Sequence, residues 1–434
     1  MRFGRKIRHL EFGTKVRVAI IALATGLVVL LIVNLPLGDK RVDENVTSLY
    51  SVEDPQFRRT MGAILGPGLL AGNRVQELVN GEQIFPAMLE AIRGARKTVT
   101  FETYIWWGGA IGAEFTRALI ERARAGVKVH VLFDALGSFK LDRKLVNEMK
   151  EAGIQVEKYN APSWDNLALM NNRTHRKILV VDGRIGFTGG AGIADDWDGN
   201  AQDKKHWRDT HYRIEGPAVA QMQGAFMENW IDTTGNVLHG EDYFPEIARA
   251  GEHVAQFFVS SPGGGSESMQ LMYVLSIAAA AKTIRLSAAY FLPDKVDLRA
   301  FIDALKRGVK VQIIVPGPET DASIVRRASR SRWGELLRAG AEIYEFQPTM
   351  YHCKVMIVDD LWVSVGSTNF DSRSFSVNDE ANLNVLHREF AKAQIGVFDD
   401  DLKHSRRISL DEWQNRPLLE KAWEHVLALF SPEL

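Results

Sequence analysis

Residues 174–190, THRKILVVDGRIGFTGG, have a second copy at residues 351–367, YHCKVMIVDDLWVSVGS. Each copy carries a histidine, a lysine two residues later and an aspartate five residues after the lysine. The two sets are His175, Lys177 and Asp182, then His352, Lys354 and Asp359. One such spacing could arise by chance, but two copies at equivalent positions indicate a functional motif.

The segments around the two copies repeat as well. ARKTVTFETYIW (95–106) resembles AKTIRLSAAYFL (281–292), and RAGVKVHVLF (124–133) resembles KRGVKVQIIV (306–315). Short β-branched strands thus alternate with helix-like segments, which favours parallel-rich sheets covered by helices. We expect an α/β fold of two similar halves, 75–245 and 255–434, related by a pseudo-twofold axis that places equivalent residues in one central cleft.

Composition narrows the function classes. The 434 residues are 46% hydrophobic and 25% charged, which is typical of a globular protein and excludes a disordered, collagenous or coiled-coil chain. The 53 Lys and Arg residues balance 54 Asp and Glu residues, so no global basic field indicates nucleic acid. The single cysteine, Cys353, excludes an intrachain disulfide and a cysteine-based zinc site.

A charge-free stretch precedes the two halves. Residues 18–37 would form a helix of about 30 Å, which is the thickness of a bilayer's hydrocarbon core. The flank at 1–17 is basic, which predicts a cytoplasmic N-terminus, a single-pass anchor in the cell membrane and a catalytic body on the non-cytoplasmic side. A cleaved signal peptide is the alternative, but the stretch is long for one and no cleavage site follows it. Residues 38–74 are expected to be a linker.

Strand periodicity orients the motif residues. His175 and Lys177 are two positions apart and so share one face of an extended strand, while Arg176 points the other way. The second copy has the same parity, which turns Cys353 away from its histidine and favours a packed core thiol.

The aspartates fall at tight turns. Asp182-Gly183 is typical of a two-residue hairpin turn, which would set His175 opposite Gly190. A two-residue turn at Asp359-Asp360 would likewise set His352 opposite Ser367, with Asn369 on the same face, unless a β-bulge shifts the register. Each aspartate is then roughly 23 Å along the strand from its histidine. The aspartates are therefore expected at a turn or an interface, not on the substrate.

These residue types suit phosphate chemistry. Two lysines form a compact positive site, and Ser367 and Asn369 add hydrogen bonds to phosphate oxygens. A neutral imidazole can attack phosphorus, and a protonated one can donate to the departing alcohol. Carboxylates can orient imidazoles, and Glu380 and Asp209 are our candidates, with an ordinary ion pair as the alternative for each.

Other clusters are weaker signals. His206 and His211 lack further ligand spacing, so we expect no metal site. A basic cluster at 326–332 could meet anionic headgroups, although a solvated helix face is the simpler interpretation.

The two copies, together with FETYIW, HWRDTHYRIEGPAV and SAAYFLPD, resemble the phospholipase D superfamily with its paired HKD motifs, and within it the bacterial cardiolipin synthase branch. The resemblance covers nearly all of 75–430. It implies two α/β halves sharing one active site, a phosphohistidine intermediate, and no cofactor or metal requirement. By this analogy His175 is the nucleophile and His352 the general acid and base. The chain departs from the branch at Gly192, where Asn is usual.

The resemblance implies a phosphatidyltransferase that moves a phosphatidyl group to the hydroxyl of phosphatidylglycerol, giving cardiolipin and glycerol. A phospholipase D hydrolase that releases phosphatidic acid would use the same residues. A nuclease is less favoured, because the charge is balanced, and we expect no nucleic-acid partner. A binding module without catalysis is disfavoured by the two intact His–Lys sets. The expected partners are a phospholipid substrate and the membrane.

Overall fold

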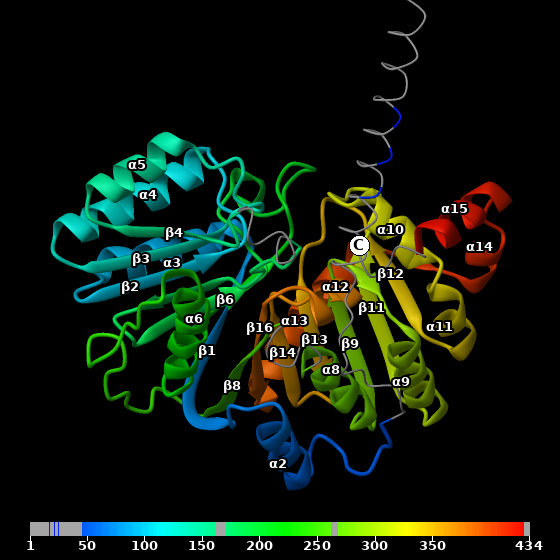
Figure 1. Ribbon diagram of the computed structural model, residues 1–434. Coiled ribbons are helices and arrows are strands. Elements are labelled where there is room, and N and C mark those ends of the chain that lie inside the picture. Colours follow the sequence, from blue (N-terminus) through cyan, green and yellow to red (C-terminus); the bar gives the residue numbers. More distant parts are fainter. Residues whose placement is uncertain are drawn as a thin grey trace, which may run out of the picture.

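The computed structural model describes residues 46–161, 171–261 and 268–428, together with Arg17, Ile21 and Thr25. Two α/β halves lie side by side in it (Figure 1). The expected anchor at 18–37 lies outside the described residues, apart from two positions. Within the described part of the chain, no helix has both the length and the apolar composition needed to cross a bilayer.

One sheet of 15 strands runs through both halves. From the junction outward, the first half contributes β1 (Leu70–Val79), β7 (Thr210–Glu215), β6 (Ile185–Gly189), β5 (Ile178–Val181), β2 (Thr98–Thr103), β3 (Lys128–Asp134) and β4 (Gln155–Tyr159). The second half contributes β8 (His253–Ser260), β16 (Glu380–Leu386), β14 (Trp362–Gly366), β13 (Lys354–Val358), β9 (Thr283–Ala288), β11 (Lys310–Pro316), β12 (Glu342–Phe346) and β17 (Ser405–Ile408). Apart from β17, the two halves follow the same order, as the internal repeat predicts.

The junction between the halves is a hydrogen-bonded strand pair. The first residues of β1 pair antiparallel with β8, and its residues from Arg74 onward pair with β7. The pairing with β8 has a register irregularity between Ala71 and Asn73, at Gly72 with a φ of +99°. In the large sheet the strands β2, β3 and β4, like β9, β11 and β12, are parallel, whereas its other ladders are antiparallel. A minor sheet pairs β10 (Phe291–Leu292) with β15 (Phe370–Asp371).

Helices cover the sheet on both faces. α2 (Pro55–Ile64) precedes β1 but packs on the second half, where Phe57 and Met61 join its apolar cluster. In the first half the helices are α3 (Asn80–Gly94), α4 (Ala110–Arg124), α5 (Arg143–Glu151), the 3₁₀ turn η2 (Asp195–Trp197) and α6 (Ala218–Thr234). In the second half they are α8 (Ser268–Ala278), α9 (Lys295–Lys306), α10 (Ser323–Arg330), α11 (Trp333–Ala339), α12 (Ser372–Ser376), α13 (Arg388–Lys403), α14 (Leu410–Gln414) and α15 (Leu418–Ala428).

The core has a layer shared by both halves. Met222 and Phe226 of α6 and Phe398 of α13 pack in one apolar cluster with strands from each half. Two further clusters lie between the sheet and the outer helices of each half. The outer helices pack through one face, as Ile111, Phe115 and Leu119 of α4 illustrate. Residues four apart lie on one helix face, and all three of these are buried. The shared layer fixes the halves relative to one another.

The motif hairpins form, but their pairing differs from the expected register by one residue. Asp182 and Gly183 occupy the turn with φ of 53° and 63°, and strand pairing resumes at Val181 with Ile185. Thr188 therefore pairs with Ile178, one position beyond Lys177. The second hairpin is shifted in the same way, with Val358 paired to Trp362. The cause in both is a three-residue connection where two residues were expected.

Candidate active site

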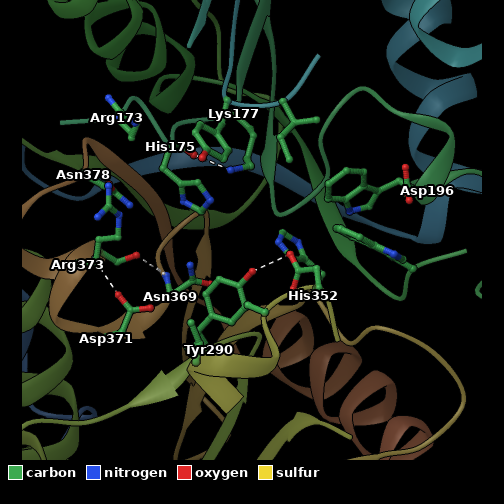
Figure 2. Close-up of a pocket in the computed structure, with 18 of the residues that line it drawn as sticks. Arg173, His175, Lys177, Asp196, Tyr290, His352, Asn369, Asp371, Arg373 and Asn378 are labelled. Atoms are coloured by element: carbon green, nitrogen blue, oxygen red, sulfur yellow. Dashed lines mark hydrogen bonds between the residues drawn. The ribbon is translucent and has the colours of Figure 1, made fainter. Parts of the chain in front are cut away.

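A cavity of about 540 Å³ lies between the halves, just beyond the carboxyl ends of β2 and β9. Both motif histidines line it (Figure 2). The lining also includes Tyr104, Trp107, Lys140, Arg173, Lys177, Trp197, Trp207, Tyr290, Asp321, Ala322, Val325, Asn369 and Arg373. Equivalent elements of the repeat thus supply one common site.

His175 is held by a carboxylate from the other half. Its Nδ1 lies 3.0 Å from both Oε1 and Oε2 of Glu380, the first residue of β16. Ser367 donates its hydroxyl to Oε2 of the same carboxylate at 2.5 Å. Glu380 is fully buried, so this contact fixes the imidazole ring and leaves Nε2 as the nitrogen free to react.

His352 is held by the reciprocal arrangement. Its Nδ1 lies 2.7 Å from Oδ2 of Asp209, which belongs to the first half. Trp197 donates its indole N–H to the same oxygen at 2.9 Å, and the backbone N–H of Thr210 donates to Oδ1. Each histidine therefore depends on a carboxylate from the opposite half. Both carboxylates are among the residues expected from the sequence, but the sequence did not indicate this exchange.

The electrostatics keep the dyad of His175 and Glu380 ready for nucleophilic attack. Burial lowers the pKa of His175 to about 4, against the opposing effect of Glu380. Burial alone would raise the pKa of Glu380, but His175, Lys177 and Ser367 lower it to about 2. Near neutral pH the pair is therefore a neutral imidazole beside a carboxylate. Burial likewise lowers the pKa of His352.

The two lysines make equivalent backbone contacts, and Lys354 Nζ also lies 3.1 Å from both ring nitrogens of His352. Lys177 Nζ donates to the backbone oxygen of His175 at 2.7 Å, and Lys354 Nζ donates to that of His352 at the same distance. Both lysines are buried, and burial lowers both pKa values, that of Lys177 to about 7. Arg176, between the motif residues, points the other way and donates to Ala225 O and Ser261 Oγ. Cys353 is buried in the core.

The motif aspartates lie at the far ends of the hairpins. Asp182 accepts backbone N–H groups from Arg96, Lys97 and Thr98 at 2.7–3.1 Å, just where β2 begins. Asp359 accepts three equivalent N–H groups, from residues 281–283, where β9 begins. Neither aspartate is among the residues that line the cavity. Each aspartate therefore joins the turn of its hairpin to the start of the neighbouring strand by hydrogen bonds.

The remaining expected residues make the two sides of the site unequal. Asn369 lines the cavity, and its side-chain oxygen is buried without a hydrogen-bond partner among the described residues. The repeat places Gly192 at the equivalent position, where a Cβ would lie 2.9 Å from Ile105. Gly190 is the counterpart of Ser367, and a Cβ on it would lie 2.2 Å from Asp209 Oδ1. The glycine at position 190 makes room for the carboxylate that holds His352.

Several residues that line the cavity were not among the site residues expected from the sequence. Arg173 and Arg373 lie on the His175 side (Figure 2), where Arg373 donates to Asn171 at 3.0 Å. Tyr104 packs edge-on against His175, and Trp207 packs against His352. Tyr104 and Tyr290 occupy equivalent repeat positions, which is a signal that could have found them. No periodic signal marks the arginines.

Among the residues that the structure describes, neither His206 nor His211 belongs to a cluster of possible metal ligands. Within the described residues, no group of three His, Cys, Asp or Glu side chains gathers in a way that could hold a metal ion. His211 is buried, and burial lowers its pKa to about 3. His206 contacts Asp203 on the surface.

Comparison with solved structures defines the class. The crystal structure of a phosphatidylserine synthase from Haemophilus influenzae aligns with a TM-score of 0.64 at 14% identity, and the match covers 87% of this chain and 100% of that one. At this identity the likeness shows the fold alone. Together with the two motif histidines that line one cavity, it defines an α/β protein of two similar halves that share one site.

The sequence comparisons then give the family. Residues 88–228 and 273–402 match the family model described as "Cardiolipin synthase, PLD-like domain". A cardiolipin synthase from Geobacillus sp. (strain WCH70) is 36% identical over 360 residues, which is 82% of this chain and 72% of the relative. Cardiolipin synthase A of Pseudomonas fluorescens is 34% identical over 368 residues, 84% and 76% of the two chains. The chain belongs to this family of phospholipase-D-like enzymes.

Proposed function

We propose that the enzyme transfers a phosphatidyl group to the free hydroxyl of phosphatidylglycerol, which yields cardiolipin and glycerol. The observation that carries the proposal is the pair of histidine–carboxylate dyads in one cavity with two buried lysines. The family membership supports the same reaction, because its curated relatives are named cardiolipin synthases.

In the first step, the lone pair on His175 Nε2 attacks the phosphorus of a phosphatidyl donor. The bond from phosphorus to the glycerol headgroup oxygen breaks, and His352 donates a proton to that oxygen. The charge on the two lysines and the Asn369 amide stabilises the phosphoryl oxygens. Glu380 stabilises the cationic phosphohistidine as it forms, because its carboxylate contacts Nδ1 of the same ring.

In the second step, the hydroxyl of phosphatidylglycerol attacks the phosphohistidine. His352, now neutral, takes the hydroxyl proton, and the phosphorus–nitrogen bond breaks to regenerate His175. Asp209 supports His352 in both directions, since its carboxylate favours the protonated ring. The cycle therefore returns both imidazoles to their starting protonation states and consumes no cofactor.

The acceptor decides between transfer and hydrolysis. Water at the second step would give phosphatidic acid, as in a phospholipase D. Trp107, Trp197 and Trp207 form an aromatic wall of the cavity, with Trp197 and Trp207 ring centroids 4.4 Å apart. Such a wall supports the transferase, because it limits access of water and offers apolar surface to a lipid acceptor.

We also propose that residues 18–37 anchor the enzyme in the cell membrane, with the catalytic body on the non-cytoplasmic side. The basic flank at 1–17 supports this orientation. Reporter fusions at the C-terminus test it: a reporter that is active only outside the cytoplasm fits the proposal, and one active only inside contradicts it.

Mass spectrometry of lipids tests the reaction. The purified enzyme is incubated with phosphatidylglycerol and a chelator, beside His175→Ala and His352→Ala. We expect cardiolipin and glycerol from the parent enzyme and neither from the variants. Phosphatidic acid as the main product would establish the hydrolase instead. Trapping by rapid acid-free quench should place the phosphoryl group on His175; its recovery on His352 would reverse the two roles.

A further inference from the structure

We infer that the mouth of the cavity is a membrane-docking surface, formed by exposed apolar side chains from both halves that enter the headgroup region of a phospholipid bilayer. The inference rests on the proposed function, since a phosphatidyl donor embedded in a bilayer reaches the cavity from a membrane surface. We call these side chains the apolar rim: Leu136, Phe139, Ile324, Leu418, Leu419 and Trp423.

The first half contributes one side of the rim. Phe139 is 70% exposed and Leu136 is 44% exposed, on the loop that follows β3. The next residue, Lys140, lines the cavity, and its ammonium lies 3.7 Å from the centre of the Trp107 ring. Phe139 therefore sits beside the cavity wall. Its ring contacts the Lys140 ammonium at 5.6 Å and otherwise leaves most of its apolar surface in water.

The second half contributes the other side. Ile324 of α10 is 52% exposed, while its neighbours Ala322 and Val325 line the cavity. α15 packs beside α10 through the ion pair of Arg330 with Glu420 at 2.7 Å, and Figure 1 shows the two helices together at one end of the second half. The cavity mouth thus lies between two exposed apolar elements.

α15 extends the rim with an apolar face of its own. Leu418, Leu419 and Trp423 are 81%, 78% and 61% exposed. At about 100° per residue, these three positions fall within about 140° of the helix circumference. A helix that turns leucines and a tryptophan to one exposed side is typical of an interfacial helix.

Charge around the rim favours an anionic bilayer as the occupant. Lys140, next to Phe139, and Arg327, on α10, are both exposed. Their long side chains can keep their cations at the phosphate level while the apolar rim lies deeper. Arg326 and Arg330 are instead paired with Glu345 and Glu420, so only part of the basic cluster at 326–332 is available to headgroups. A second copy of the chain on this face is the rival occupant.

The structure supplies matched control positions. Ile64, on α2, is 55% exposed and lies at the opposite end of the fold from α10 (Figure 1). Phe244 is 40% exposed. It lies two residues after Asp242, which accepts a hydrogen bond from Lys128 at the start of β3. Phe139 instead lies beyond the other end of β3. Ile64→Asp and Phe244→Asp therefore introduce the same changes away from the rim.

Activity on two forms of the same lipid tests the inference. The full chain is reconstituted in phosphatidylglycerol vesicles, and separately assayed on dihexanoyl phosphatidylglycerol dispersed as monomers. In Phe139→Asp/Ile324→Asp, activity on vesicles should fall about tenfold or more, because each charge opposes entry of the rim, while activity on monomers stays within about twofold. The double control should match the parent enzyme on both lipids. Equal losses on both lipids would overturn the inference.

A fluorescent probe gives a readout that does not depend on turnover. Cys353, the one native cysteine, is buried, so a polarity-sensitive thiol label reports on an introduced cysteine. A label on Phe139→Cys should shift to shorter wavelengths when anionic vesicles are added, and a label on Phe244→Cys should not. No shift at either position would refute docking. A shift with no turnover of any lipid would instead refute the proposed function alone, and a shift caused by protein concentration without vesicles would favour a second copy.

Discussion

Glu380 and His175 lie 205 residues apart in the chain and belong to different halves, yet both carboxylate oxygens sit 3.0 Å from the imidazole Nδ1. Asp209 and His352 repeat the arrangement in the opposite direction. Neither half holds a complete dyad, so the active site exists only when the two halves are packed together.

Glu380→Gln should reduce kcat for cardiolipin formation between about a hundredfold and ten-thousandfold, because an amide neither stabilises the cationic ring nor enforces the tautomer with a free Nε2. Steady-state kinetics on phosphatidylglycerol measure the loss. Glu241→Gln removes an exposed carboxylate and serves as the control. A loss in Glu380→Gln that disappears when activity is normalised to folded protein would count against the orienting role.

The pH dependence should be set by three buried groups, His175, His352 and Lys177. Burial lowers the pKa of His175 to about 4 and that of Lys177 to about 7. kcat/KM should therefore rise as His175 loses its proton on the acid side. It should fall at higher pH as His352, whose pKa burial lowers, loses the proton that it must donate, and as Lys177 loses the charge that binds phosphate. A bound phosphate favours charged Lys177, so the alkaline limb of kcat should lie at higher pH. Profiles on monomeric short-chain lipid check this; a kcat/KM that stays constant through the alkaline range would contradict it.

Asp182→Ala should destabilise the protein more than it affects chemistry. The variant loses the acceptor for three backbone N–H groups and places alanine at a φ of 53°, which we expect to cost about 1–3 kcal/mol in free energy of unfolding. Urea denaturation measures the cost, and kcat per folded molecule should stay close to the parent value. Asp182→Asn is the milder comparison. A normal stability with kcat abolished would make Asp182 part of the chemistry.

Gly190→Ala should impair catalysis through Asp209. The new Cβ would lie 2.2 Å from Asp209 Oδ1, so the carboxylate must move away from His352. A displacement of this size should lower kcat by about a hundredfold. Gly224→Ala on α6 meets no heavy atom within 4 Å and should leave kcat unchanged with stability equal or higher by up to about 1 kcal/mol. Similar activity in the two variants would show that Asp209 tolerates displacement.

The features that follow from the internal repeat could be predicted from the sequence, whereas contacts between the two halves could not. The duplicated segments predicted the strands, the two-half organisation and the parity that turns Arg176 from the cavity, because strand periodicity is a local property. The register was off by one, since an Asp-Gly pair does not tell a two-residue from a three-residue connection. The exchange of Glu380 and Asp209 between halves, and the approach of Arg173 to Arg373, arise from packing that no spacing in the chain encodes.

The continuous ladder from β7 through β1 to β8 constrains how such a protein can diverge. A duplicated chain with a flexible hinge could change the angle between its copies and so alter its chemistry. Here the copies are locked edge to edge by backbone hydrogen bonds, which substitutions of side chains do not remove. Divergence between the copies is then confined to the surfaces that meet the ligand, as Gly190 beside Ser367 and Gly192 beside Asn369 illustrate. The backbone keeps the twofold relation between the copies, while the side chains make the two sides of the cleft different.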